Sequence, residues 1–161
     1  MADAARPVSA CLAELGITLP PVAAPVAAYV PAVRTGDLVF TSGQLPFTDG
    51  ALPATGSVGD TGEGAAVSPE DAASYARTAT LNALAAIDDL VGLDNVAQIV
   101  KVVGFVASAP GFGGQPAVVN GASDLLGEIF GEDGAHARSA VGVAELPLGS
   151  PVEVELTVRV V

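Results

Sequence analysis

The basic side chains of this 161-residue chain are few, because 18 acidic residues face only six lysines and arginines and the formal net charge is −12. A small anionic ligand would therefore bind one of these six residues or a set of backbone N–H groups. Arginine suits a carboxylate because its planar guanidinium group donates two parallel, charge-assisted hydrogen bonds. The six candidates are Arg6, Arg34, Arg77, Lys101, Arg138 and Arg159.

One of these arginines belongs to a pair of predicted strands at the C-terminus. Residues 152–160 alternate between apolar and polar side chains, which predicts a half-buried strand with Glu153 on its polar face. If the valines of the preceding strand form its core face, Arg138 lies on the opposite face, as Glu153 does. A polar face is ordinarily solvated. Here, however, two small residues beside the arginine leave room for a ligand or a neighbouring subunit, namely Ala140 and Gly142.

The elements that would position these residues follow the order ββαβαββ. Ser68 can cap a helix that ends near Gly92, with Pro69 in its first turn. A second helix ends at Gly131, and a short additional helix is expected near the N-terminus. The strands are expected at 29–33, 38–41, 99–107, 138–144 and 152–160. This order predicts an α+β fold with two helices packed on one face of a mixed sheet.

Domain organisation is simple. We expect a single domain over residues 26–161, preceded by an N-terminal extension of residues 1–25 that is interrupted by several prolines. Residues 48–67 are rich in Gly, Thr and Asp and read as a long loop, which in a compact domain is either functional or mobile.

Composition excludes several classes of protein. The six basic residues are not clustered, so nucleic acid is not an expected partner. No apolar run is long enough for a membrane span, and no secretory signal is expected. Cys11 is the only cysteine and His136 the only histidine, which excludes an internal disulfide framework and a multi-histidine metal site. We expect a cytoplasmic protein, with His136 in a structural or exposed role.

Two blocks of sequence resemble the signatures of the reactive intermediate deaminase family, also called the RidA/YjgF family. The first is Tyr29-Val-Pro-Ala-Val followed by Gly36-Asp-Leu-Val-Phe-Thr-Ser-Gly-Gln-Leu-Pro46. The second is Ala137-Arg-Ser-Ala-Val-Gly-Val-Ala-Glu-Leu-Pro147 followed by Val152-Glu-Val-Glu155. The resemblance covers about residues 25–161, and the N-terminal extension indicates a divergent subgroup.

The resemblance implies a fold, an assembly and an activity. Family members have a chorismate-mutase-like α+β fold and form homotrimers whose sheets line a central barrel, with sites in clefts between subunits. The well-known members hydrolyse 2-imino acids such as 2-iminopropanoate and 2-iminobutanoate to 2-keto acids and ammonia, without a cofactor. The partners it implies are a small carboxylate substrate and further copies of the chain.

Site residues follow from the same resemblance. Arg138 matches the arginine that binds the substrate carboxylate, and Glu153 matches the glutamate that positions the attacking water. Tyr29 matches a tyrosine contributed to the cleft by the adjacent subunit. Four further positions match residues that line the cleft: Ser42, Gly43, Asn120 and Ala140, the last of which is cysteine in many members.

The sequence leaves two questions open. A non-catalytic trimer that binds a small carboxylate in the same cleft is the alternative function, whereas a ribonuclease lacks the basic surface it needs. The second question is geometric. If the last two strands formed a hairpin, Glu153 would lie about four residues from the partner of Arg138, or ~13 Å along the strand.

Overall fold

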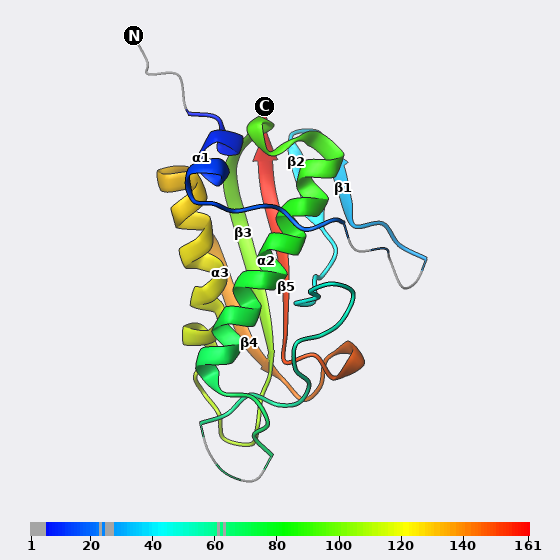
Figure 1. Cartoon of the computed structure of the whole chain (residues 1–161), viewed down its shortest axis with the longest axis vertical. Helices are drawn as coiled ribbons and strands as arrows, with labels where there is room; N and C mark the ends of the chain where they lie inside the picture. Colours follow the sequence, from blue (N-terminus) through cyan, green and yellow to red (C-terminus); the bar gives the residue numbers. More distant parts are fainter. Residues whose placement is uncertain (1–5, 23, 25–27, 61, 63) are drawn as a thin grey trace.

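The computed structural model describes residues 6–22, 24, 28–60, 62 and 64–161. The order of elements agrees with the expected ββαβαββ series, preceded by one short helix (Figure 1). The first five elements are α1 (Val8–Glu14), β1 (Ala32–Thr35), β2 (Leu38–Thr41), α2 (Pro69–Val91) and β3 (Val96–Ala107). The last three are α3 (Gln115–Phe130), β4 (Ala137–Val143) and β5 (Val152–Val160). Short 3-10 turns lie at Leu93–Asn95, Gly131–Gly134 and Pro147–Gly149.

The sheet is mixed and five-stranded, in the order β1-β2-β5-β3-β4. Only β3 and β4 run parallel, and the other neighbouring pairs are antiparallel. The long helices α2 and α3 cover one face of this sheet, as expected (Figure 1). The core lies between these two layers and is built mainly of small aliphatic side chains.

Local sequence explains the ends of the main helix. The Ser68 hydroxyl accepts a hydrogen bond from the Asp71 N–H at 3.1 Å, which caps the N-terminus of α2 as predicted. The helix ends before Gly92, whose positive φ of 78° suits glycine. Its buried face consists largely of alanine, which lets α2 lie close to α3 and β5.

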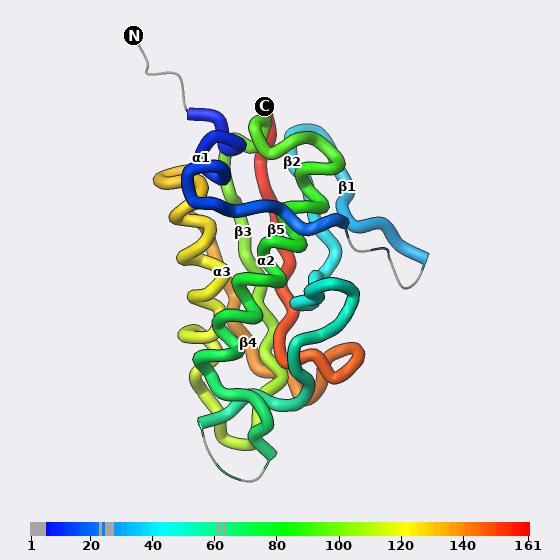
Figure 2. The backbone as a smooth tube through the Cα atoms, viewed as in Figure 1, coloured from blue at the N-terminus to red at the C-terminus, as the bar shows by residue number. Residues whose placement is uncertain are grey.

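The N-terminal helix packs on the domain. Val8 and Leu12 of α1 are buried in the common core. Ser9 donates through its N–H and its hydroxyl to the two carboxylate oxygens of Asp94, each at 2.8 Å, and these bonds lower the pKa of Asp94. Figure 2 shows the segment after α1 crossing in front of α2 towards β1. The expected extension begins with residues 1–5, which lie outside the described residues.

Strand boundaries differ from expectation by more than one residue at β1 and β3, and β4 is shifted by one residue to Ala137–Val143. The first strand begins at Ala32 and not at Tyr29, because Pro31 has no N–H to donate to a ladder. The third strand begins at Val96, three residues before the expected start at Ile99, and its early part contains irregular register against β5.

The expected orientation of β4 is wrong. Arg138 pairs with buried Val102 of β3, and its side chain lies on the helix-covered side of the sheet. Val141, which was expected in the core, is 42% exposed on the open side. The reason is the close approach of α3, since a Cβ added at Gly142 would lie 2.7 Å from the Gln115 side chain. The small residues of β4 therefore make room for a helix.

The hairpin considered for the last two strands does not form. Both β4 and β5 pair with β3, so one strand lies between them. Any site that uses side chains from β4 and β5 must therefore span three strands or take them from two copies of the chain.

Candidate functional site

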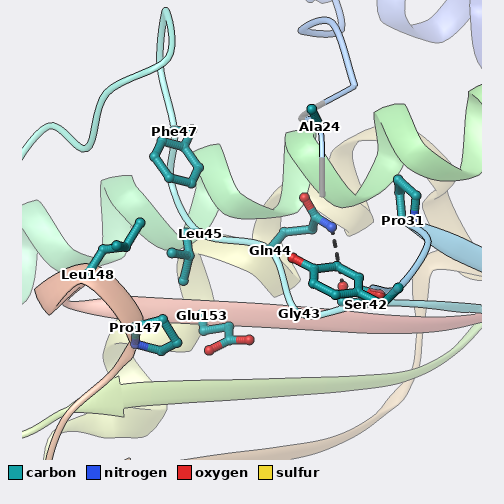
Figure 3. Close-up of a pocket in the computed structure, with 11 residues that line it drawn as sticks. Ala24, Pro31, Ser42, Gly43, Gln44, Leu45, Phe47, Pro147, Leu148 and Glu153 are labelled. Atoms are coloured by element: carbon teal, nitrogen blue, oxygen red, sulfur yellow. Dashed lines mark hydrogen bonds between the residues drawn. The ribbon is translucent and has the colours of Figure 1, made fainter. Parts of the chain in front are cut away.

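A cavity of about 460 Å³ lies where the segment after β2 meets the start of β5 (Figure 3). Most of the residues that line it are apolar, and a few are polar. Four residues singled out from the sequence line it: Tyr29, Ser42, Gly43 and Glu153. The remaining lining residues are Ala24, Pro31, Gln44, Leu45, Phe47, Pro147 and Leu148.

Glu153 places a carboxylate at the edge of this apolar cavity. It follows the first residue of β5, and its neighbours Val152 and Val154 are buried in the core on the opposite face. Partial burial raises the pKa of Glu153, and the negative charge of Glu155 on the same face raises it further. A carboxylate in such a setting is a better proton acceptor near neutral pH than an exposed one.

Backbone hydrogen bonds hold the Ser42–Gln44 turn against β5. Gln44 and Val154 exchange two of them, at 2.8 and 3.0 Å. Ser42 is fixed on the other side, since its N–H donates to Pro31 O at 2.8 Å and its hydroxyl donates to Val30 O at 2.6 Å. Gly43 consequently lies directly against Glu153, and a Cβ at this position would overlap the carboxylate (Figure 3).

Gly43→Ala is therefore expected to displace the carboxylate end of Glu153 and to lower the free energy of unfolding by up to about 1 kcal/mol, which is less than overpacking a rigid core costs because this side chain can move. Gly127→Ala is the matched control, because a Cβ there meets nothing within 4 Å and its helical position favours alanine. Urea denaturation of both variants measures the difference. Equal stability of the two variants would mean that Gly43 does not pack against Glu153.

A second group of side chains lies around Arg138. One guanidinium nitrogen, Nη1, donates to Asn120 Oδ1 at 2.8 Å and to Ser123 Oγ at 3.2 Å, and the other, Nη2, donates to Pro116 O at 3.3 Å. Ala140 follows two residues later on the same face and packs against the core. Neither salt bridge found among the described residues involves Arg138. Its positive charge is available to an external anion.

Within one chain the two groups lie apart. Arg138 pairs with Val102, which pairs with Leu156, three residues beyond Glu153 on β5. Two strand spacings and three residues amount to roughly 14 Å between the Cα atoms of Arg138 and Glu153. Their side chains also leave opposite faces of the sheet, so the expectation of a shared face is wrong. A single chain therefore presents two half-sites, one on each face.

Sequence reasoning missed several members of both groups. Leu45, Phe47, Pro147 and Leu148 come from two loops, and no periodic pattern indicates that these loops meet. Ser123, which contacts Arg138, was not singled out. Gln44 belongs to the Ser-Gly-Gln motif and could have been identified there.

Neither a metal site nor a membrane span is found in the described part of the chain. No three His, Cys, Asp or Glu side chains among these residues are grouped so that they could hold a metal ion. No helix in the same part of the chain is both long and apolar enough to cross a membrane.

Comparisons with known proteins agree on one family. The model for "YjgF/chorismate mutase-like, putative endoribonuclease" matches residues 9–159. Protein TCP17 of Trypanosoma cruzi is 42% identical over 154 residues, which cover 94% of this chain and 93% of TCP17.

Solved structures give the same result. A protein of Shewanella oneidensis described as a putative endoribonuclease superposes with a TM-score of 0.89 at 33% identity, covering 96% of this chain and 100% of that one. TdcF of E. coli, solved with bound serine, has a TM-score of 0.61 at 27% identity, covering 88% and 93% of the two chains. This chain belongs to the YjgF/chorismate-mutase-like family.

Proposed function

We propose that this chain hydrolyses reactive 2-imino acids to 2-keto acids and ammonia. Family membership indicates a RidA-like role, and the observation that carries the finer assignment is the carboxylate of Glu153. It is partly buried at the edge of an apolar cavity, and its pKa is raised. The apolar cavity suits a hydrocarbon side chain such as that of 2-iminobutanoate, and the Glu153 carboxylate can position one water molecule. The single cysteine supports a cytoplasmic setting.

The chemistry needs few groups. Glu153 accepts a proton from water while the water oxygen bonds to C2 of the protonated imine and the C=N π electrons move to nitrogen, which gives a neutral carbinolamine. Glu153 then returns that proton to the nitrogen. The C–N bond breaks with its electrons on the departing ammonia, and the hydroxyl oxygen forms the C=O bond of the 2-keto acid as its proton passes to Glu153. Arg138 holds the substrate carboxylate throughout, so most of the rate enhancement comes from positioning.

A homotrimer would bring the two half-sites together. The open face of the sheet carries apolar side chains that a monomer would leave in water, among them Val33, Phe40 and Val141, which are 52%, 42% and 42% exposed. Packing of these faces between copies would cover them. Because β4 is an edge strand, Arg138 of one subunit would reach around this edge to the Glu153 cavity of its neighbour, beside Tyr29.

Light scattering is expected to give three times the chain mass of 15.8 kDa at micromolar concentration. Phe40→Glu should dissociate the assembly, because it places a charge in the proposed contact. Arg34→Glu, at an exposed position of β1, is the control for added negative charge. A wild-type mass of 15.8 kDa would contradict the shared site.

The reaction itself is tested with freshly generated 2-iminobutanoate and 2-iminopropanoate, using semicarbazide to trap the imine that remains. We expect the protein to shorten the lifetime of the imine and Arg138→Ala to abolish this effect. The bound serine of TdcF supports a ligand of amino-acid type. If 2-keto acids bind but the imine lifetime is unchanged, the chain is a non-catalytic carboxylate-binding trimer.

A further inference from the structure

A line of hydrogen bonds runs behind Arg138 and ends at the only histidine of the chain. Ser123 Oγ, on α3, lies 3.2 Å from Arg138 Nη1 and 2.9 Å from His136 Nε2. His136 Nδ1 lies 2.6 Å from the backbone oxygen of Gly134, which is buried. The three side chains come from α3, from β4 and from the short segment that joins them.

The chemistry of the groups assigns a direction to each bond. A carbonyl oxygen only accepts, so His136 must carry its hydrogen on Nδ1 to donate to Gly134 O. In a neutral imidazole Nε2 is then an acceptor, and the Ser123 hydroxyl donates to it. Ser123 Oγ still has lone pairs, and one of them accepts from Arg138. The hydrogen bonds all point the same way, from Arg138 to Gly134. Hydrogen bonds arranged in such a series polarise and strengthen one another.

The hydrogen bonds of Arg138 determine which edge of its guanidinium group remains free. Both N–H groups of Arg138 Nη1 are engaged, one by Asn120 and the other by Ser123. Pro116 O takes one N–H of Nη2. A carboxylate binds arginine through two adjacent N–H groups. The Nη1–Nη2 edge is closed to it, and the Nε–Nη2 edge is the one left for a ligand.

We propose that Ser123 and His136 are positioning residues that hold Arg138 with its Nε–Nη2 edge turned to the substrate carboxylate. The inference rests on the proposed function only for the identity of that carboxylate. Ser123 contacts the guanidinium group, and His136 acts through Ser123 by fixing the direction of its hydroxyl. An arginine without this support would rotate about its side-chain bonds and would lose conformational freedom when it binds the ligand, which weakens binding.

The single histidine makes the first test direct. Nitrogen-15 NMR of the imidazole at pH 8 needs no residue assignment, because every histidine signal comes from His136. We expect the Nδ1–H tautomer, and we expect 2-oxobutanoate to shift its signals although the ligand binds to Arg138. The Nε2–H tautomer, or rapid exchange between the two tautomers, would overturn the proposal.

The second test separates positioning from folding. Ser123→Ala is expected to weaken 2-oxobutanoate binding by about tenfold or more, as for the loss of a bond to a charged group. Ser123→Thr keeps the hydroxyl and should stay within about twofold of the wild type. Ser74→Ala, at an exposed serine of α2, is the matched control. Calorimetry measures affinity, and circular dichroism checks the fold.

The outcomes also separate a failure of the positioning role of Ser123 and His136 from a failure of the deaminase assignment. Equal affinity of Ser123→Ala and wild type, or no rescue in a folded Ser123→Thr variant, would overturn the positioning role. A wild-type chain that binds no 2-keto acid would overturn it as well. If binding follows the expected order but no imine is hydrolysed, the positioning role stands and the deaminase assignment fails.

Discussion

Arg138→Ala is expected to weaken the binding of 2-keto acids by about 100-fold or more, because it removes two charge-assisted hydrogen bonds to the ligand. The fold should survive. Arg138 lies on the edge strand β4, and its hydrogen bonds to α3 lie near the surface. Calorimetry with 2-oxobutanoate measures the loss, and thermal unfolding checks that the chain remains folded.

Arg138→Lys is the sharper comparison. Lysine keeps the positive charge but presents a single ammonium group in place of a planar fork, and its three N–H donors cannot serve Asn120, Ser123 and both oxygens of a carboxylate together. We therefore expect little recovery over the alanine variant. A lysine variant with wild-type affinity would show that charge alone binds the ligand and that the two-pronged contact is wrong.

Glu153→Gln is expected to lower imine hydrolysis by about 100-fold or more while leaving 2-keto acid binding nearly unchanged, the usual consequence of losing a positioned base. Glu155→Gln is the matched control from the same face of β5, one pleat or about 7 Å along the strand. It should retain activity. The opposite ranking would assign the base to Glu155.

The pH dependence gives an independent check on Glu153. Its carboxylate is the active form and its pKa is raised, so activity should fall on acidification at a pH above the ordinary glutamate value of 4.5. Since the charge of Glu155 contributes to this rise, Glu155→Gln should move the acid limb to lower pH. An acid limb that does not move would mean that the two carboxylates do not interact.

Stability is expected to change in the opposite direction to activity. A raised folded-state pKa means that ionisation of Glu153 opposes folding, so its contribution to stability is complete below about 4.5 and is lost as the pH rises through the folded-state value. Glu153→Gln removes this cost. The inactive variant should therefore be more resistant to urea than the wild type at pH 8, and equally resistant near pH 4.

Local patterns predicted most of the fold. The alternation of residues 152–160 matches β5, and Ser68 caps α2 as expected. The orientation of β4 could not be obtained in this way, because alternation shows that two faces differ and does not show which one is buried. That choice depends on α3, which approaches so closely that a Cβ at Gly104 would lie 2.5 Å from Val119. Strand neighbours are likewise a tertiary property.

The candidate site was likewise predicted only in part from the sequence. Tyr29, Ser42, Gly43 and Glu153 do line one cavity, although they come from separate segments. The motif did not indicate that Arg138 lies on the other face, since sequence spacing carries no information about which strand lies between two others. Ser123 and His136 are 13 positions apart on different elements, and only the packed structure brings them together.

The central claim is that each site takes Arg138 from one subunit and Glu153 from another. It is tested by mixing the two inactive variants, Arg138→Ala and Glu153→Gln, through joint unfolding and refolding in equal amounts. In a cyclic trimer with random assembly, about a quarter of the sites would combine an intact arginine with an intact glutamate. We expect the mixture to recover about a quarter of the wild-type rate of imine hydrolysis. A mixture that stays as inactive as its two components, while the refolded wild type is active, would contradict it.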